Sequence, residues 1–337
     1  MLGEPPTATS ARCEKILVIR GGAIGDFILT LPVLSALRAH YPEAGLELLG
    51  YPHIAQLALE GGLVDAVRPI EARDLAAAFA PDAVLSDDLA DYFSDFDLIV
   101  SYLYDPGQIF QENIASVSPA RFIAGPHRPD PFADKHATEI FLQPLAEIGV
   151  LRSDPTPRLN LRHAQTAPPR ADMPPAEAHP ARPSRLAIHP GSGSERKNWP
   201  ESCWADLMSR LASRVDWDLV LVGGEAEGQR LERLALCWPA ERLEIARSLP
   251  LVELARRLAD CRFYIGHDSG ITHLAAALGL PGLVLWGESA IRVWRPCQEA
   301  MRCLHAGMRL AELEVEEVWA ALTAHLCLDE PGTGSLR

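Results

Sequence analysis

The sequence predicts an α/β protein of two doubly wound domains, each built on a parallel sheet. Short apolar runs alternate with helical runs along most of the 337 residues, a pattern typical of βαβ units. One opening, a strand followed by a glycine loop and a helix, occurs twice, in KILVIRGGAIGD from Lys15 and in RLAIHPGSGS from Arg185. A proline-rich stretch separates the two copies. A chain of this length is more often two domains than one.

The expected boundaries follow from that stretch. QTAPPRADMPPAEAHPARPS contains six prolines and almost no large apolar residues, which is typical of an extended, fairly stiff linker. We therefore expect an N-terminal domain over residues 1–162, a linker over 163–184 and a C-terminal domain over 185–337.

In the first half, apolar runs predict strands at 15–20, 45–50, 97–101 and 120–125. LALEGGLVDAVRPI, residues 57–70, predicts a helix end, a turn and a further short strand. Helices are expected after the first glycine loop and over 136–148, where Gly149 would end the helix. Six aspartates lie at 82, 87, 88, 91, 95 and 97. Because they lack the spacing of a calcium loop, a solvated loop or helix face is favoured over a metal site.

In the second half, strands are predicted at 186–188, within DLVLVGGE at 218–225, at 262–265 and at 283–286. Helices are predicted at 201–214, 226–237 and within LVELARRLADC at 251–261. A further helix opens at Gly270 and is stopped by Gly279 and Pro281. The last helix, AELEVEEVWAALTAHLCL at 311–328, is expected to pack back across the domain boundary.

Composition narrows the class of protein. The formal net charge of -14 argues against general nucleic-acid binding, so an anionic ligand must be held by a local pocket. None of the seven cysteines forms a C-x-x-C pair, and no run approaches the about 18 apolar residues of a membrane span. The start of the chain lacks a signal-peptide core. These features predict a cytoplasmic protein with reduced thiols that contacts a membrane only at its surface.

The strand, turn and helix in RFYIGHDSGITHLAAALGLPGLVLWG, from Arg262, predict one ligand site. Asp268, Ser269, Gly270 and Thr272 fall between a strand's carboxyl end and a helix's amino end, where ligands bind in open α/β sheets. Free N–H groups there favour an anion by about 0.3 to 1 kcal/mol per charge. The alternative is that Asp268 or Ser269 merely caps the helix. His273, one turn after Ser269, favours a ligand site because packing does not require it.

A second loop, HPGSGSERKNWP from His189, also suits an anion. Gly191 and Gly193 allow backbone amides close to a ligand, Ser192 and Ser194 offer hydroxyls, and Lys197 offers a mobile positive charge. The loop lacks the G-K-[ST] ending of a Walker motif, so a surface turn is the alternative. Both loops follow strands in the same half, and we predict that they lie side by side and hold a diphosphate.

The first glycine loop is a poor match to the dinucleotide fingerprint G-x-G-x-x-G, because Ala23 occupies the second glycine position. Gly21, Gly22 and Gly25 allow a tight turn, and Asp26 falls where the next helix begins. Asp26 is either a reactive carboxylate at a strand end or a helix cap.

Three stretches together resemble glycosyltransferase family 9, the ADP-heptose:lipopolysaccharide heptosyltransferases. They are IRGGAIGDFILTLPVLSALR, HPGSGSERKNWPESCWADL and GHDSGITHLAAALGLPGLVLWG, and the weaker pieces between them fall in the family's order over about residues 15 to 290. The resemblance implies the GT-B architecture, two facing Rossmann-like domains with the acceptor on the first and the nucleotide sugar on the second. It also implies an inverting transfer that needs neither a metal nor another cofactor.

The resemblance also implies residue roles. Asp26 matches the proposed catalytic base, with Gly22 and Gly25 in the acceptor-side loop. Lys197 matches the lysine that holds the donor diphosphate. The other donor-site positions are Ser192, Gly193 and Ser194 in the phosphate loop, Asp268, Ser269, Gly270, Thr272 and His273 in the D-[ST]-G-x-x-H segment, Glu225 or Glu227 for the ribose, and the backbone of Leu249 for the adenine. The chain departs from the family where G-P-[ST] is usual, because Glu288 replaces the proline.

We therefore expect an ADP-sugar donor, a glycan or lipopolysaccharide-core acceptor, no nucleic-acid partner and a peripheral location at the inner membrane surface. Three alternatives remain open: a nucleotide-sugar epimerase of the same fold, a protein that binds ADP-sugar without turnover, and an NAD oxidoreductase, which the missing fingerprint disfavours.

Overall fold

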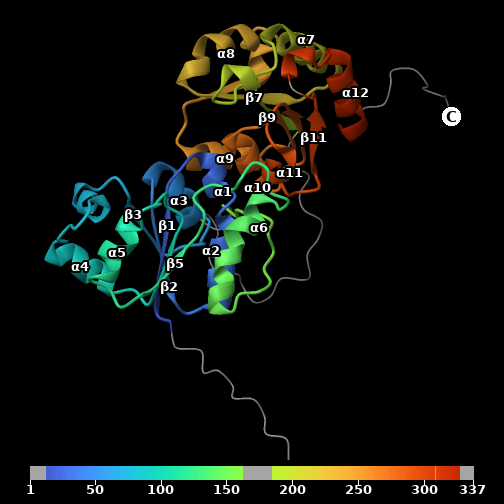
Figure 1. The fold of residues 1–337 in the computed structure, drawn as a ribbon. Coiled ribbons are helices and arrows are strands. Elements are labelled where there is room, and N and C mark those ends of the chain that lie inside the picture. The colour runs from blue at the N-terminus through green and yellow to red at the C-terminus, as the bar shows by residue number, and fades with distance from the viewer. Residues whose placement is uncertain (1–12, 162–183, 308, 327–337) are drawn as a thin grey trace, which may run out of the picture.

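The computed structural model describes residues 13–161, 184–307 and 309–326. Two parallel sheets lie one above the other, with helices on both faces of each (Figure 1). The predicted linker, residues 163–184, falls almost wholly outside the described residues, as do the expected outer ends of both domains. Where the domains begin and end therefore stays a prediction.

The first sheet has the order β3-β2-β1-β4-β5. Its strands are β1 Lys15–Arg20, β2 Gly45–Gly50, β3 Ala66–Pro69, β4 Leu98–Ser101 and β5 Arg121–Ala124. Its helices are α1 Ile24–Ile28, α2 Leu31–His40, α3 Pro52–Glu60, α4 Asp87–Ser94, α5 Ile109–Ala115 and α6 Ala137–Leu142. The order reverses between β1 and β4, so a crevice forms at the carboxyl ends of these two strands.

The second sheet has the order β11-β10-β9-β6-β7-β8, and it reverses between β6 and β9. Its strands are β6 Arg185–His189, β7 Asp218–Gly223, β8 Leu243–Arg247, β9 Phe263–His267, β10 Gly282–Trp286 and β11 Met301–His305. Its helices are α7 Glu201–Arg214, α8 Gly228–Ala235, α9 Leu251–Ala259, α10 Gly270–Ala277, α11 Ile291–Trp294 and α12 Val315–Leu326. The two sheets confirm the predicted fold class.

Strand side chains alternate between clusters on the two faces of each sheet. Ile16 and Val18 of β1 belong to a large core that also contains Leu274 and Leu280 of the second half. Leu17 and Ile19 face a smaller cluster confined to the first half. One apolar core therefore runs between the sheets, and the backbone N–H of Leu159 donates to the carbonyl of Ala277 at 2.9 Å. The two halves are packed against each other there.

Several predicted elements differ in detail. The helix expected at 136–148 is α6 followed by a 3-10 helix at Gln143–Ile148, because Pro144 removes a backbone donor inside the run. The helix expected at 226–237 spans only α8, after a 3-10 turn at Glu225–Glu227. The turn expected at 266–269 is shorter, because β9 continues to His267. The elements α5, α11, β8 and β11 were not predicted.

We expected the last helix to pack across the domain boundary, but it does not. Val318 and Leu322 of α12 are fully buried in the core that lies against the outer face of the second sheet, and α12 packs against α7. Because its buried side chains belong to a core made of C-terminal residues, the helix at 315–326 stays on the C-terminal half.

Candidate functional site

The two predicted anion loops lie side by side, as expected. β6 and β9 are hydrogen-bonded neighbours, with His189 opposite Gly266. The loops that leave these strands, residues 190–199 and 268–269, therefore start at the same edge of the sheet, at its point of reversal. This edge is where open α/β sheets bind ligands.

An ion pair joins the two loops. Lys197 Nζ lies 2.8 Å from Asp268 Oδ2. The Asp268 side chain is 13% exposed and that of Lys197 is 33% exposed, so the pair is partly shielded from water. The contact places the ammonium group of the predicted lysine beside the residue that precedes the cap of α10.

Ser269 caps α10, and its Oγ accepts from the N–H of Thr272 at 3.3 Å. The Thr272 side chain is fully buried; its Oγ1 donates to the His267 carbonyl and lies 2.9 Å from Tyr264 Oη. Ser269 therefore caps as the alternative interpretation proposed. The buried Thr272 side chain is engaged in contacts within the fold.

The first residues of α10 meet the first residues of α1 from the other half of the chain (Figure 1). A Cβ on Gly270 would come within 2.7 Å of Ile24 Cβ, and one on Gly25 would come within 3.3 Å of His273 Cδ2. Gly270 is required because a side chain there would collide with α1, and the position of Gly25 is tight as well. Gly25 and Gly270 thus bring the two predicted sites together.

His273 lies at this junction and is 5% exposed. Burial lowers its pKa, the negative charges of Asp268 and Asp26 raise it, and the charges of His136 and Lys197 lower it further. His273 therefore lies where the two predicted sites meet.

Asp26 is the third residue of α1, and Ala23 is the cap. Its Oδ2 lies 3.4 Å from the N–H of Ala23, and a Cβ on Gly22, whose φ is +100°, would lie 3.3 Å from that same oxygen. The Asp26 side chain is 29% exposed. Asp26 therefore occupies a capping position without being the N-cap, and it keeps a face toward solvent.

Arg20, which sequence reasoning missed, lies behind Asp26. It is 3% exposed, and its Nη2 is 3.2 Å from the Asp26 carbonyl and 4.0 Å from Oδ1. Burial lowers the pKa of Arg20, while the charges of Asp26 and Tyr102 raise it. Within the described chain its Nε has no hydrogen-bond partner. A charged residue directly after the apolar run Ile16, Leu17, Val18, Ile19 was the available signal.

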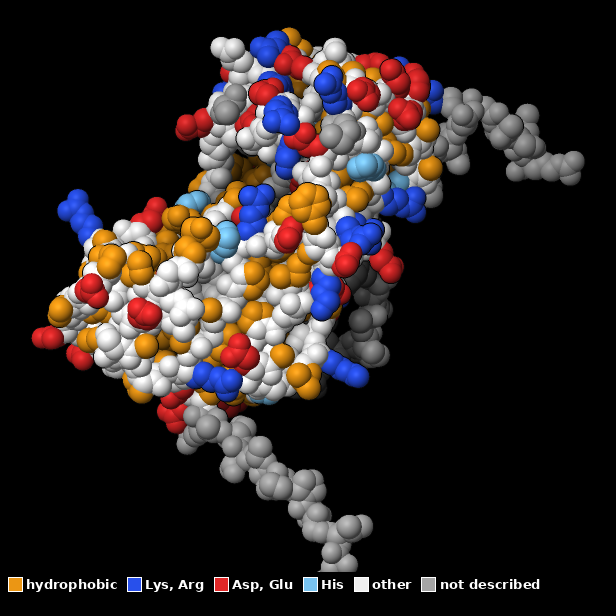
Figure 2. Space-filling view, in the orientation of Figure 1, with side chains coloured by type: hydrophobic (Ala, Val, Ile, Leu, Met, Phe, Trp, Pro, Cys, Tyr) orange, Lys and Arg blue, Asp and Glu red, His pale blue; other side chains and the backbone are white. Residues whose placement is uncertain are grey.

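A pocket of about 450 Å³ opens beside Asp26 on the N-terminal half. Aromatic rings and two arginines dominate its wall. Its lining residues are Arg20, Gly21, Gly22, Asp26, Tyr51, Ile70, Glu71, Phe79, Tyr102, Leu103, Tyr104, His127 and Arg128. Figure 2 shows a hollow between the two domains on the visible face. A concave site with apolar walls and a few polar groups is the usual form of a small-ligand site.

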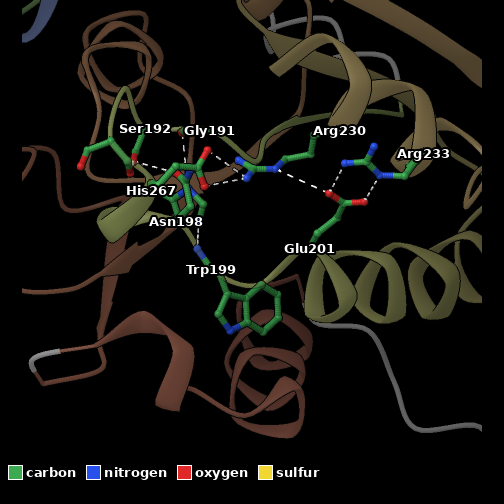
Figure 3. A network of polar contacts seen from close by, with 10 residues as sticks. Gly191, Ser192, Asn198, Trp199, Glu201, Arg230, Arg233 and His267 are labelled. Carbon is green, nitrogen blue, oxygen red and sulfur yellow. Dashed lines mark hydrogen bonds and ion pairs between the residues drawn. The ribbon is translucent and has the colours of Figure 1, made fainter. Parts of the chain in front are cut away.

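The glycine-serine loop is held by its own polar groups. Ser192 Oγ lies 2.9 Å from the Ser194 carbonyl and 2.8 Å from Asn198 Oδ1 (Figure 3). Gly193 has a φ of +70°, in the left-handed region that glycine adopts without strain. The hydroxyl of Ser192 is engaged within the loop.

The two candidate ribose carboxylates differ. Glu227 Oε2 accepts from the N–H of Gly224 at 2.9 Å, and its side chain lies under Gly191, where a Cβ would come within 2.7 Å of Oε1. Glu225 is exposed at the start of the 3-10 turn. Leu249 is partly buried beside the large core, after Ser248 with a φ of +49°.

Glu288, the departure from the family pattern, follows β10. Its Oε2 lies 3.1 Å from Nη2 of Arg196 in the glycine-serine loop. Together they border a cavity of about 520 Å³, which is lined by Glu195, Arg196, Asn198, Glu288, Arg309, Leu310 and Ala311.

Two buried histidines, His189 and His267, lie beneath the loops and were also missed. Burial lowers the pKa of His189 to about 4 and that of His267 to about 3. Each is the last residue of its strand. That repeated position, before P-G in one loop and before D-S in the other, was the signal in the sequence.

Among residues 13–161, 184–307 and 309–326, no group of three or more His, Cys, Asp or Glu side chains is placed to hold a metal ion. Within the same ranges, no helix has the length and apolarity needed to cross a membrane.

The family model described as glycosyltransferase family 9 (heptosyltransferase) matches residues 130–319, more than half of the chain. Lipopolysaccharide heptosyltransferase 1 of Pseudomonas aeruginosa is 37% identical over 115 residues, which are 34% of this chain and 31% of the relative. The chain thus matches about a third of the length of that curated relative. A putative glycosyltransferase of Haemophilus influenzae is 22% identical over 302 residues, 85% of this chain and 87% of the relative.

Solved structures give matches over nearly the whole chain. The ADP-heptose lipopolysaccharide heptosyltransferase II of Escherichia coli has a TM-score of 0.70 and 17% identity, and the match covers 93% of this chain and 98% of that one. A family 9 glycosyl transferase from Veillonella parvula has a TM-score of 0.70 and 18% identity, with 93% and 97% covered. At these identities the matches show a shared fold.

Proposed function

Because the chain belongs to glycosyltransferase family 9 and has the GT-B fold, we propose that it is an inverting, metal-independent glycosyltransferase. It transfers a sugar, a heptose from ADP-heptose, to the lipopolysaccharide core or a related glycan. The observation that carries the proposal is the junction of α1 and α10. Asp26, in α1 of one domain, and the Lys197–Asp268 pair, at the start of α10 of the other, flank this junction, where a Cβ on Gly270 would lie 2.7 Å from Ile24 Cβ.

The donor diphosphate binds between the two C-terminal loops. Backbone amides at Gly193 and Ser194, the amino end of α10 and the ammonium group of Lys197 supply positive potential. Asp268 keeps Lys197 over that edge. As the bond to ADP breaks, negative charge grows on the diphosphate, and these groups stabilise it in the role that a metal ion serves elsewhere.

The ribose hydroxyls bind Glu225. Glu227 already accepts a backbone hydrogen bond and lies under Gly191, whereas Glu225 is exposed. The backbone of Leu249, in the segment after β8, contacts the adenine. Glu288 and its partner Arg196 border the space next to the diphosphate loop, where they contact the donor sugar.

The acceptor sugar occupies the pocket beside Asp26, against its aromatic wall. Asp26 removes the proton from the attacking hydroxyl as the oxygen bonds to the anomeric carbon and ADP leaves from the opposite side, which inverts the configuration. The buried Arg20 fixes Asp26 through its backbone carbonyl. The names of the relatives point to a lipopolysaccharide acceptor. The proposal therefore includes a cytoplasmic protein that contacts the inner face of the membrane peripherally.

The test is a mass-spectrometric screen of the purified protein with ADP-heptose and other nucleotide sugars, with and without acceptor glycans, in the presence of a chelator. We expect an acceptor heavier by one sugar residue and an equal amount of ADP. Release of an altered sugar without acceptor would instead identify an epimerase. Donor binding without any product would identify a non-catalytic protein, and strict magnesium dependence would contradict the proposed metal independence.

A further inference from the structure

One imidazole ties together both ends of the glycine-serine loop. His267, the last residue of β9, is fully buried. Its Nε2 accepts from the N–H of Trp199 at 3.0 Å, and its Nδ1 lies 3.4 Å from the carbonyl oxygen of Gly191. Gly191 and Trp199 are the two ends of the loop, and Figure 3 shows the ring between them.

The chemistry of the ring fixes its tautomer. Burial, and next the charge of His189, lower the pKa of His267 to about 3, so the ring is neutral near pH 7. A neutral imidazole has one donor and one acceptor. Because Nε2 accepts from the Trp199 N–H, Nδ1 carries the proton and donates to Gly191.

A third contact holds the middle of the loop. Arg230 of α8 reaches both carboxylate oxygens of Glu195, at 2.9 and 3.2 Å. Arg230 Nε lies 3.8 Å from Glu201, which Arg233 also binds (Figure 3). The residues between these contacts include Gly193, Ser194 and Lys197, which we propose to bind the diphosphate.

We propose that His267 is a positioning residue for the nucleotide-sugar site. It holds the two ends of residues 191–199 in the shape that binds the ligand, so that little ordering entropy is lost on binding. This inference rests on the proposed function, because the loop's ligand is taken to be the donor diphosphate. The competing explanation is packing alone, since the ring also lies edge-on to Trp204 at 5.3 Å.

Three variants separate these explanations. His267→Leu keeps an apolar volume and removes both hydrogen bonds. In His267→Gln, the side-chain oxygen can accept from Trp199, and in His267→Asn, the side-chain N–H can donate to Gly191. We expect the Leu variant to bind ADP about tenfold more weakly or worse, on the scale of lost hydrogen bonds at both ends of the loop. The Gln and Asn variants each recover part of that affinity.

The measurements are ADP titration calorimetry, steady-state kinetics and hydrogen exchange of the amides of residues 191–199 in the protein without ligand. The donor KM should rise while kcat and the acceptor KM stay near wild type, and loop amides should exchange faster in the Leu variant. His305→Gln, at the exposed end of β11, is the matched histidine control. Arg230→Met should also speed exchange, whereas Arg233→Met, which leaves the Glu195 contacts intact, should not.

Wild-type ADP affinity and wild-type loop exchange in the Leu variant would overturn the inference. So would an affinity loss that neither the Gln nor the Asn variant reduces, because packing alone would then explain it. If the wild-type protein failed to bind ADP, the proposed function would fall, while exchange in the loop would still report whether His267 orders it.

Discussion

The N-terminal and C-terminal sides of the candidate site differ in how firmly their side chains are held. On the N-terminal side, Asp26 stands partly exposed beside an open pocket, and its nearest cation, Arg20, lies 4.0 Å from its carboxylate. On the C-terminal side, Lys197 is already paired at 2.8 Å, and the loop that carries it is tied at both ends by His267. In the proposed mechanism, the first side presents the reactive carboxylate, and the second presents a binding loop that is already held in place.

This difference predicts which free energy changes when a residue on either side is substituted: that of the transition state or that of ligand binding. An exposed carboxylate that touches the acceptor only during reaction affects the rate, because it acts in the transition state. A prearranged cation and loop affect ground-state binding of the diphosphate as well. Substitutions on the N-terminal side should therefore lower kcat, and substitutions on the C-terminal side should weaken donor affinity.

The Asp26→Asn variant tests this contrast most directly, with the largest expected effect. We expect turnover to fall by about 10² to 10⁴, the usual contribution of a positioned general base, while ADP affinity and melting temperature stay near wild type. Asparagine keeps the size of the side chain and an oxygen for the Ala23 N–H. Steady-state rates beside calorimetry measure both quantities.

Asp26→Ala is the companion variant. If Asp26 only stabilises the start of α1, the Ala variant should lose about 0.5 to 2 kcal/mol of stability and the Asn variant should remain active. Near wild-type turnover of the Asn variant would therefore remove Asp26 from the mechanism.

The C-terminal counterpart is Lys197→Ala. ADP affinity should weaken by about 1.5 to 3 kcal/mol, the range for hydrogen bonds to charged groups, and the unpaired Asp268 would add repulsion toward the diphosphate. Calorimetry without divalent metal measures the effect. The control is Lys135→Ala, which removes an exposed lysine outside both loops and should cost far less. Equal ADP affinity in wild type and the Lys197→Ala variant would exclude Lys197 from the site.

The contact that joins the two regions can be tested through Gly270→Ala. Alanine normally favours a helix over glycine by about 1 kcal/mol, but here its Cβ would lie 2.7 Å from Ile24 Cβ. We expect a net loss of about 1 to 3 kcal/mol in unfolding free energy, typical of overpacking. The control is Gly107→Ala, whose Cβ would meet the nearest side-chain atom at 3.5 Å. Greater stability in the Gly270→Ala variant would show that the two helices separate readily.

Most strands could be predicted from the sequence, because buried strands are continuous apolar runs between glycine turns. The sequence also predicted that the two anion loops follow neighbouring parallel strands. KILVIR and GLELLG coincide with β1 and β2. β11 was missed because MRCLH mixes a charge with apolar residues at a sheet edge. Short helices such as α11 are too brief to show a period.

The sequence indicates which residues form the candidate site, but it does not show which of them contact one another. Sequence spacing placed Lys197 and Asp268 in adjacent loops, yet the ion pair between them depends on loop shape, which no local pattern encodes. Arg20 and His267 were missed because both sit at the ends of apolar strands, where their importance comes from burial. The close approach of Gly25 and Gly270 involves residues far apart in the sequence, so it requires the packed domains.

The last prediction concerns the acid stability of the loop that His267 holds. His267 has a pKa lowered by burial from its ordinary value of 6.5 to about 3. Between these values the unfolded chain binds a proton that the folded protein does not. Stability therefore rises with pH in this window, and it is lost as pH falls from about 6.5 toward about 3. One such group contributes a slope of about 1.4 kcal/mol per pH unit. His189, whose pKa is lowered to about 4, adds a second slope.

His267→Gln removes one of these protons, so the unfolding free energy should depend less steeply on pH between about 6 and 4, by about one proton's worth. Urea melts at several pH values measure it, and an unchanged denaturant slope shows that the unfolded state is comparable. His189→Gln should flatten the same window, and the double variant should flatten it further. An undiminished pH slope in the His267→Gln protein would mean that the ring titrates alike in both states. The contrast between the partly exposed Asp26 carboxylate and the buried, neutral His267 ring would then fail.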